Sequence, residues 1–273
     1  MDDADRSGTT AAPILHAKHH SAPSVFQPEN LLREARRQKG LPLAGVPEIC
    51  LLDPDGDIAR TLRAEGRGVP CAGWACYHTE LLEFSEGSER FGVVGCAVGA
   101  PFAVLVAEQL FASGCRLLVS ITSAGQIAAS GPTPYFVLID RALRDEGTSY
   151  HYLPPAPFAD ADPALIEQAA RALAQTDLAI YRGATWTTDA PFRETESAIA
   201  FAAERGVLAV EMEAAALYAF AQARGRPVVC FAHVTNQMAQ IEGDFEKGEA
   251  NGTRDALALL RAVASGWQKP DKA

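Results

Sequence analysis

Short, almost uniformly apolar segments alternate with helix-length segments along most of the chain, and this alternation constrains the fold more than any other feature. The segment PVVCFAHV at residues 227–234 is apolar at nearly every position rather than at every second one. This pattern indicates a strand buried on both faces, as in a parallel sheet covered by helices. The alternation therefore predicts the α/β class, with a mostly parallel central sheet.

Apolar periodicity and turn residues place these segments along the chain. The expected strands are residues 48–52, 72–84, 91–98, 115–121, 134–139, 178–183, 207–210 and 228–235. The expected helices are residues 28–40, 58–65, 101–113, 163–175, 194–205, 212–224 and 252–265. Residues 86–89 join two adjacent strands and predict an antiparallel hairpin within the sheet. No linker interrupts the pattern after residue 45, so a single domain is expected.

The chain before residue 48 does not follow the strand and helix alternation. Residues 1–23 have the composition of a flexible tail, and residues 24–47 are interpreted as an N-terminal helical extension. Three histidines in the tail (His16, His19 and His20) resemble a metal cluster, but a flexible tail explains them more simply, so no metal site is expected. The main domain is expected to cover residues 48–268.

Charge and apolarity exclude two classes of partner. The 273 residues include 24 basic and 34 acidic side chains, which gives a formal net charge of −10 at pH 7. Such a chain has no basic stripe to neutralise phosphates, so we expect no nucleic-acid partner. No apolar run approaches the roughly 20 residues that span a bilayer, so we expect no membrane partner.

Cysteine usage and the first residues indicate the compartment. None of the six cysteines forms a CxxC pair, and most lie in apolar strand-like runs, as expected for buried thiols in a reducing cytoplasm. The first 20 residues begin with acids and lack the apolar core of a secretory signal. We therefore expect a cytoplasmic protein.

Two strand-to-helix loops carry residues that suit an anion, and such loops are where parallel α/β sheets bind ligands. In LLDPDGDIAR, Gly56 permits a sharp turn and Arg60 follows about one helical turn later. On this loop alone, a plain turn with a solvated arginine is the simpler interpretation. In LLVSITSAGQI, Thr122 and Ser123 offer hydroxyls that could hold phosphate or sugar, and hydroxyl capping of a turn explains them equally well. The spacing of Gly95 and Gly99 is a weaker signal, which usually reflects packing.

The segment VEMEAAALYAFA places Glu211, Met212 and Glu213 between a buried strand and an apolar helix. A carboxylate can accept from two vicinal hydroxyls at once, which is the arrangement of a ribose diol. Acids also complement the dipole of a helix N-terminus, and this explains Glu213 without a ligand. Both interpretations predict that the acids lie at the start of the helix.

Two further stretches suit a planar heterocycle. The loop ATWTTDAPFRET offers aromatic, acidic and basic side chains, namely Trp186, Asp189, Phe192 and Arg193. The same loop could instead be a capped helix entry. At the end of the strand FAHVTN, the side chain of Asn236 has both a donor and an acceptor for a base.

These residues together resemble the nucleoside phosphorylase-I family, which contains purine nucleoside and uridine phosphorylases and is related to methylthioadenosine nucleosidases. VEMEAAALYAFA resembles the family signature, DGDIAR its phosphate loop, ITSAG its Gly-(Ser/Thr)-(Ala/Thr)-Gly loop, and HVTN its late strand. The resemblance runs from about Glu48 to Ala264. It implies a single α/β domain with a central mixed, partly barrel-like sheet flanked by helices.

The resemblance also implies a reaction and roles for the residues above. Phosphate would attack the anomeric carbon of a nucleoside and release the base and a (deoxy)ribose 1-phosphate, with no metal or organic cofactor and with inorganic phosphate as co-substrate. It implies that phosphate contacts Gly56, Arg60, Thr122 and Ser123. The ribose would contact Glu211, Met212 and Glu213, and the base would contact Trp186, Asp189, Phe192, Arg193 and Asn236. Family members assemble as homodimers or as homohexamers built from three dimers.

The chain departs from the family pattern at two positions. Ser120 stands where phosphorylases usually have a phosphate-binding arginine, and nucleosidases lack that arginine too. A basic residue such as Arg63, Arg67 or Arg90 could replace it across a subunit interface. Asn236 stands where purine-specific members usually carry an aspartate. An asparagine at this position is the pattern of pyrimidine and 6-oxopurine enzymes.

Three functions follow from this reading. A nucleoside phosphorylase acting on a pyrimidine (uridine-like) or 6-oxopurine nucleoside is the leading hypothesis, with Glu213, Arg60 and Asn236 as the catalytic residues. A hydrolytic nucleosidase using water is the second, because of Ser120. A non-catalytic nucleoside-binding protein is the third.

Overall fold

The computed structural model describes residues 12–16, 18–238 and 242–268, and every structural statement below concerns these residues. Within them, ten strands form one mixed sheet. The strands are β1 (Ile49–Asp53), β2 (Val69–Pro70), β3 (Leu82–Glu86), β4 (Glu89–Gly95), β5 (Leu117–Gln126), β6 (Tyr135–Asp145), β7 (Phe158–Asp160), β8 (Ile180–Thr188), β9 (Val207–Glu211) and β10 (Val228–Asn236). Their order is β10-β6-β8-β9-β5-β1-β4-β3-β2, and β7 pairs with β6.

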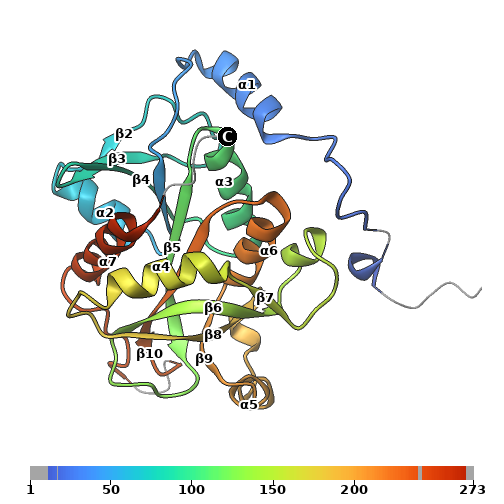
Figure 1. Ribbon diagram of the computed structural model, residues 1–273, viewed down its shortest axis with the longest axis vertical. Helices are drawn as coiled ribbons and strands as arrows, with labels where there is room; N and C mark the ends of the chain where they lie inside the picture. Colours follow the sequence, from blue (N-terminus) through green and yellow to red (C-terminus); the bar gives the residue numbers. More distant parts are fainter. Residues whose placement is uncertain (1–11, 17, 239–241, 269–273) are drawn as a thin grey trace, which may run out of the picture.

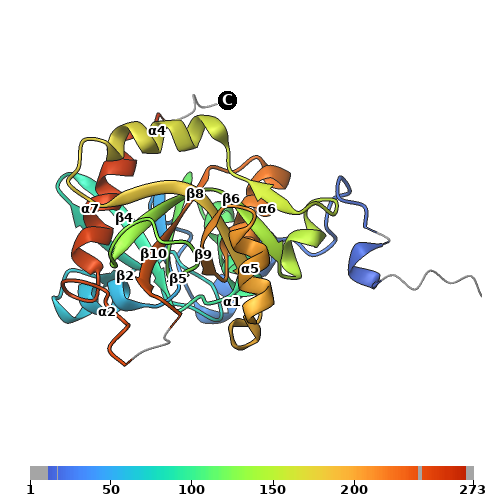
Figure 2. The ribbon, with the colours of Figure 1, turned by 90° about the horizontal axis from the view of Figure 1, so that it is seen from below.

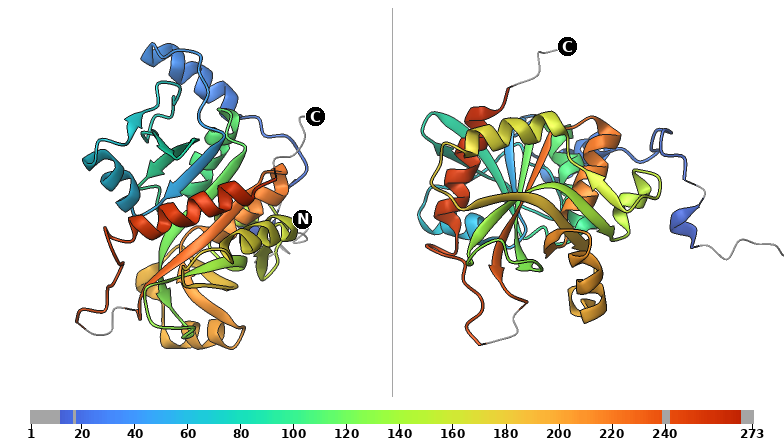
Figure 3. Two further views of the ribbon diagram at one scale, coloured as in Figure 1. Left: turned by 60° about the vertical axis from the view of Figure 1, so that its left-hand side comes forward. Right: turned by 60° about the horizontal axis from the view of Figure 1, so that its bottom comes forward.

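Strand β5 closes part of this sheet into a barrel. It pairs in parallel with β1 and β10, and near its end Gly125 and Gln126 pair in antiparallel fashion with β9. Because β10 also pairs with β6, the strands β5, β10, β6, β8 and β9 form a closed ring. The ring is visible end-on in Figure 2 and in the right-hand view of Figure 3. Strands β1, β4, β3 and β2 extend from β5 as an open wing.

Helices cover both the ring and the wing (Figure 1). They are α1 (Pro28–Lys39), α2 (Asp57–Ala64), α3 (Ala100–Ala112), α4 (Pro163–Leu173), α5 (Glu196–Ala203), α6 (Ala214–Arg224) and α7 (Thr253–Gly266), with short 3-10 turns η1 (Pro13–Leu15), η2 (Thr148–His151) and η3 (Pro191–Arg193). Helix α4 packs against α7, α3 packs against α6, and α1 packs against α3. The expected N-terminal helix is therefore present, ending at Gly40 with φ = 65° as the left-handed cap.

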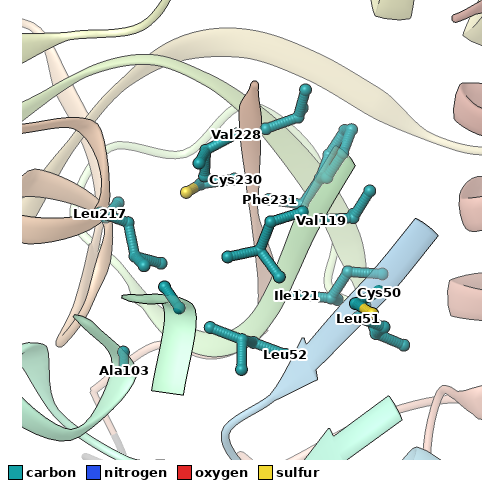
Figure 4. Packing of buried hydrophobic residues seen from close by; sticks show 14 of the residues in the cluster. Cys50, Leu51, Leu52, Ala103, Val119, Ile121, Leu217, Val228, Cys230 and Phe231 are labelled. Atoms are coloured by element: carbon teal, nitrogen blue, oxygen red, sulfur yellow. The ribbon is translucent and has the colours of Figure 1, made fainter. Parts of the chain in front are cut away.

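Helix α6 lies in the interior rather than on the surface. Every residue from Ala214 to Phe220 is buried, which explains why its sequence has no polar face. Its Leu217 lies in the same apolar cluster as Leu52 of β1, Val119 of β5 and Phe231 of β10, as Figure 4 shows. The start of α6, where the acidic motif lies, is therefore held by a packed core.

The expected single α/β domain with a mixed, partly barrel-like sheet is confirmed, as is the β3–β4 hairpin. The strand expected at residues 72–84 is wrong over most of its length. Residues 71–81 are irregular there, because Trp74 fills the core while its indole N–H donates to the carbonyl and hydroxyl of Thr79. Strand β7 was not expected.

Several other boundaries differ from the expectation. Strand β5 continues to Gln126 rather than ending at residue 121, because Thr122 to Gly125 keep pairing with β10. Strands β6 and β8 are also longer at their C-terminal ends, where they pair with each other up to Asp145 and Thr188. The hydroxyl cluster of the ITSAG segment is therefore part of a strand and not of a loop.

The remaining general expectations concern cysteines, metals and the tail. Five of the cysteines are buried free thiols, while Cys96 is exposed. Across the described residues, no group of three or more side chains is arranged to hold a metal ion, and no helix is long and apolar enough to cross a bilayer. The expected tail at residues 1–23 lies partly outside the described residues, at 1–11 and 17.

Candidate functional site

The fold gathers the predicted sugar and anion residues around the C-terminal half of β5. Strands β1, β4, β5 and β10 run in parallel, so the segments that follow them meet at one edge of the sheet. The end of β9 reaches the same place, because its Val210 pairs with Gly125 of β5. Thr122 and Ser123 occupy adjacent positions on β5 and separate two groups of polar side chains.

Glu211 organises the first group. Its Oε2 accepts from the backbone N–H groups of Glu213 and Ala214, each at 2.7 Å, and its Oε1 accepts from the hydroxyls of Thr185 and Thr187 on β8. The first two bonds satisfy amides at the start of α6, which have no partner within the helix. Glu213 is the N-cap residue but its side chain makes no cap hydrogen bond, so Glu211 is the acid that pairs with these amides.

Glu213 keeps a carboxyl oxygen available. Its Oε1 accepts from the backbone N–H of Gly99 at 2.7 Å, which ties the start of α6 to the start of α3. The residue is only 1% exposed, and within the described residues its buried Oε2 has no hydrogen-bond partner. Buried polar atoms are rarely left unpaired, so this oxygen is suited to accept from a ligand hydroxyl.

The two acids share one buried site, and burial raises the pKa of both. Burial and the nearby charge of Glu211 together raise the pKa of Glu213 to about 8, against the Gly99 amide and the Thr122 hydroxyl, which lower it. Burial also raises the pKa of Glu211, but its four hydrogen-bond donors favour the charged form. The folded state therefore holds the Glu213 proton to a higher pH than an exposed glutamate does.

This proton gives a testable pH dependence of stability. The ordinary pKa is 4.5, so the folded state binds the Glu213 proton more tightly than the unfolded state does. The stability that Glu213 contributes is therefore fully present below about pH 4.5 and is lost as the pH rises through about 8. Glu213→Gln should flatten the decline in unfolding free energy between pH 5 and pH 9, measured by urea titration at each pH. The exposed Glu204→Gln control should keep the wild-type slope, and a Glu213→Gln slope equal to wild type would contradict this assignment.

The second group surrounds the loop after β1. Gly56 has φ = 78°, and a Cβ there would lie 2.7 Å from Nη1 of Arg60 and 2.5 Å from Sγ of Cys96. Glycine is therefore required by both the backbone and the close approach of these side chains. Arg60 donates to Asp57 at 2.7 Å and to the carbonyl of Asp55 at 2.8 Å. The structure thus brings Gly56 and Arg60 together, as predicted.

Buried Asp53 fixes the backbone of this loop through hydrogen bonds. Its carboxylate accepts from the N–H groups of Gly56 and Ala59 at 3.0 and 2.9 Å. Burial raises its pKa to about 6, while these two amides lower it. The amides of the loop are therefore partly committed to an internal acid, and the remaining positive charge at the loop comes from side chains.

Ser123 faces this loop, whereas Thr122 faces Glu213. Asp55 accepts from the backbone N–H of Ser123 at 3.1 Å and from its hydroxyl, and it also contacts Nζ of Lys247 at 3.4 Å. Successive side chains of a strand point to opposite faces, which explains why the two hydroxyls serve different groups. The Ser123 hydroxyl therefore lies at the loop after β1, and the Thr122 hydroxyl lies at the Glu213 carboxyl.

The candidate substitutes for the usual arginine are all engaged on the surface. Arg63 pairs with Glu80, Arg67 with Glu65 and Glu86, and Arg90 with Glu83. Ser120 itself is buried, and in the described part of the chain its hydroxyl has no hydrogen-bond partner.

The residues predicted for the base are not brought together within this chain. Trp186 is buried, points away from Thr185 and Thr187, and donates to Asp145 at 3.0 Å. Asp189 accepts from the N–H of Gly147 at 2.9 Å.

The remaining predicted base residues divide between surface and interior. Phe192 is 99% exposed in η3, and Arg193 is exposed beside it. Asn236 is buried at the end of β10, where its amide donates to the Ala124 carbonyl at 3.5 Å and accepts from the Met238 N–H at 2.9 Å. Of the predicted base residues, Asn236 lies nearest the ITSAG segment.

Sequence reasoning missed four residues of the site. Thr185 and Thr187 alternate with Trp186, and this spacing could have shown that two hydroxyls share one face of a strand. Asp55 was read only as part of a turn. No sequence signal distinguished Lys247, which lies 190 residues from its partner Asp57.

Comparisons with known proteins agree with the fold. Residues 49–265 match the family model described as the phosphorylase superfamily. The structure is similar to uridine phosphorylase from Vibrio fischeri ES114, with a TM-score of 0.64, 19% identity and coverage of 91% of this chain and 98% of that chain. It is also similar to purine nucleoside phosphorylase from Toxoplasma gondii in complex with immucillin-H, with a TM-score of 0.68, 16% identity and coverage of 81% and 91%.

Two curated proteins show sequence similarity over part of their length. A guanosine phosphorylase from Halorubrum lacusprofundi is 26% identical over 150 residues, which cover 54% of this chain and 61% of the relative. A DeoD-type purine nucleoside phosphorylase from Myxococcus xanthus is 29% identical over 138 residues, which cover 50% and 58%. The matches thus span about three fifths of the length of these relatives.

Proposed function

The chain belongs to the phosphorylase superfamily, and from this premise we propose that it is a nucleoside phosphorylase. In the proposed reaction, inorganic phosphate cleaves the N-glycosidic bond of a pyrimidine (uridine-like) or 6-oxopurine nucleoside. The products are the free base and a (deoxy)ribose 1-phosphate. We propose that the reaction needs no metal and no organic cofactor.

One observation carries this proposal. Glu213 has a buried carboxyl oxygen without a hydrogen-bond partner among the described residues. Arg60 and the Ser123 hydroxyl lie on the other side of β5, at the loop after β1. The first suits the ribose hydroxyls and the second suits a phosphate. A nucleoside held by both would present its anomeric carbon between them.

The chemistry follows from this placement. A phosphate oxygen forms a bond to the anomeric carbon while the bond from that carbon to the base nitrogen breaks, and the base leaves with the electron pair and takes up a proton. The transition state resembles an oxocarbenium ion, so a phosphate anion beside the ring stabilises it. Glu213 would orient the ring by accepting from the ribose hydroxyls.

Asn236 supports the choice of base. Its side-chain amide can donate to a carbonyl oxygen of a uracil or a 6-oxopurine and accept from the ring N–H. The Halorubrum relative is named a guanosine phosphorylase, and guanosine is a 6-oxopurine nucleoside. This name favours a 6-oxopurine base over a uracil. A base would have to replace the present bonds of Asn236 to Ala124 and Met238.

A nucleoside panel with and without phosphate tests the proposal. Uridine, thymidine, inosine, guanosine and adenosine are incubated with the protein, and base release and ribose 1-phosphate are quantified. We expect release from uridine or from the 6-oxopurine nucleosides, and only with phosphate present. Equal rates without phosphate would refute phosphorolysis, and turnover of adenosine alone would refute the proposed base class.

Replacing Arg60 with alanine should weaken the binding of phosphate and leave the binding of the nucleoside largely unchanged. The KM for phosphate should rise about tenfold or more, because a charge-assisted hydrogen bond is lost, while the nucleoside KM should stay within about threefold. Arg60→Lys should lie between the two, since lysine keeps the charge without the planar fork. Equal loss for both substrates would instead indicate a structural role for Arg60.

A hydrolytic nucleosidase is the second candidate. Ser120 supplies no positive charge, and the carboxylate of Asp55 already accepts from the donors of Ser123. Both features disfavour a phosphate at the loop, so water could serve as the nucleophile. Detection of ribose 1-phosphate as the product would exclude this candidate.

A further inference from the structure

Lys247 connects the segment between β10 and α7 to the loop between β1 and α2, residues 54–56, which we call the anion loop. Its Nζ lies 2.6 Å from Oδ2 of Asp57 and 3.4 Å from Oδ2 of Asp55. The side chain is 26% exposed, much less than the 60% of Arg60. A lysine buried to this extent loses part of its hydration, so the site must supply negative partners.

Three donors converge on a single oxygen of Asp55. Its Oδ2 accepts from the backbone N–H of Ser123 and from the Ser123 hydroxyl, and it contacts the Lys247 ammonium. An amide, a hydroxyl and an ammonium around one anionic oxygen are the donors that bind a phosphate oxygen. This arrangement is an anion cradle that an internal carboxylate occupies.

The charges at the loop show why the cradle can exchange its occupant. Three carboxylates, of Asp53, Asp55 and Asp57, lie at this loop. Lys247 contacts Asp55 and Asp57, and Arg60 contacts Asp57, whereas Asp53 accepts from backbone amides. A phosphate arriving here would repel Asp55, the acid that holds the Ser123 donors. Rotation of Asp55 away from the cradle would release both Ser123 donors and the ammonium together.

We propose that Lys247 supplies, from within the same chain, the phosphate-binding charge that Ser120 does not, and that phosphate binds by displacing Asp55 from Lys247 and Ser123. This inference rests on the proposed phosphorylase function and names the residues that set its phosphate affinity. The two acids then have different roles. Asp57 positions the ammonium, and Asp55 competes with phosphate for it.

Three variants and one control test the inference. Lys247→Met removes the charge and keeps most of the apolar stem, Lys247→Arg keeps the charge, and Asp55→Asn removes the competing charge. Arg254→Met is the matched control, because Arg254 is an exposed cation of α7 that pairs with Glu249. For each protein, the KM of phosphate is measured at saturating nucleoside, the KM of nucleoside at saturating phosphate, the Kd of inorganic phosphate by calorimetry, and the Tm.

The expected results separate the two residues. Lys247→Met should raise the KM and Kd of phosphate about tenfold or more, with the nucleoside KM within about threefold of wild type. Lys247→Arg should restore most of the phosphate affinity. Asp55→Asn should lower the KM and Kd of phosphate by roughly threefold to tenfold, because a like charge is removed. Arg254→Met should behave as wild type.

Two results would overturn the inference while leaving the phosphorylase function intact. The first is a Lys247→Met protein that requires phosphate and has the wild-type KM and Kd for it. The second is a lower Tm with equal losses for both substrates and no rescue by Lys247→Arg, which would show that Lys247 only fastens the segment before α7 to Asp55 and Asp57. Phosphate-independent base release by wild type would refute the function itself. The calorimetric Kd values of phosphate for wild type and Lys247→Met would still show whether Lys247 binds phosphate. Absence of phosphate binding to wild type would overturn both.

Discussion

Replacing Glu213 with glutamine is expected to lower kcat/KM for the nucleoside by about a thousandfold. In the part of the chain that the structure describes, Oε2 of Glu213 is a buried carboxyl oxygen without a hydrogen-bond partner. Glutamine keeps the shape, but it replaces one carboxyl oxygen with an NH2 group, which donates and cannot accept from a ribose hydroxyl. The loss should appear in kcat as well as in KM, because sugar orientation matters most in the transition state.

Steady-state kinetics on the nucleoside identified by the panel would measure this effect. Met212→Ala, a half-buried neighbour, should cost much less, because it removes packing and no hydrogen bond. Glu204→Gln, on the exposed end of α5, should be neutral. A Glu213→Gln protein with near-wild-type kinetics would refute the assignment of this carboxyl to the ribose.

Replacing Glu211 with alanine is expected to destabilise the fold by about 3 to 5 kcal/mol. The change leaves two backbone amides at the start of α6 and two threonine hydroxyls of β8 without their acceptor. All four donors are buried, so water cannot replace the carboxylate without opening the core. The opposing gain, removal of a desolvated carboxylate with a raised pKa, is smaller than this loss because four donors satisfy it.

Urea unfolding at pH 7 measures this change, with Glu204→Ala as the control for loss of an exposed acid, expected within about 0.5 kcal/mol of wild type. Thr185→Val and Thr187→Val should each cost less than Glu211→Ala, because each removes a single donor. A Glu211→Ala protein as stable as wild type would show that the four bonds contribute nothing net. The residue would then be free to serve the ligand directly.

Much of the fold could be predicted because burial on both faces is visible in composition. Segments such as 227–234 are apolar throughout, and this marked the central strands without any knowledge of their partners. The irregular segment at 71–81 was misassigned for the same reason. Trp74 and its neighbours are as buried as a strand, and burial alone does not reveal whether the backbone pairs.

The candidate site was predictable where the chemistry is local in the chain. Glu211, Met212 and Glu213 lie within three residues, and Gly56 and Arg60 within one helical turn, so short patterns reveal them. The division of labour between the two glutamates was not predictable. It depends on Thr185, Thr187 and Gly99, which other strands and helices bring to opposite ends of the motif.

The amino-acid sequence by itself determined the α/β class, the family and the positions of the Glu211–Glu213 segment and of the glycine turn before Arg60, because each depends on periodicity or on residues close together in the chain. Only the tertiary structure decided that β5 closes the sheet into a ring, that Glu211 caps α6 while Glu213 remains open to a ligand, and that Lys247 meets Asp55 and Asp57. The physical reason is that strand pairing and polar contacts join residues up to 192 positions apart, and their selection depends on packing in three dimensions.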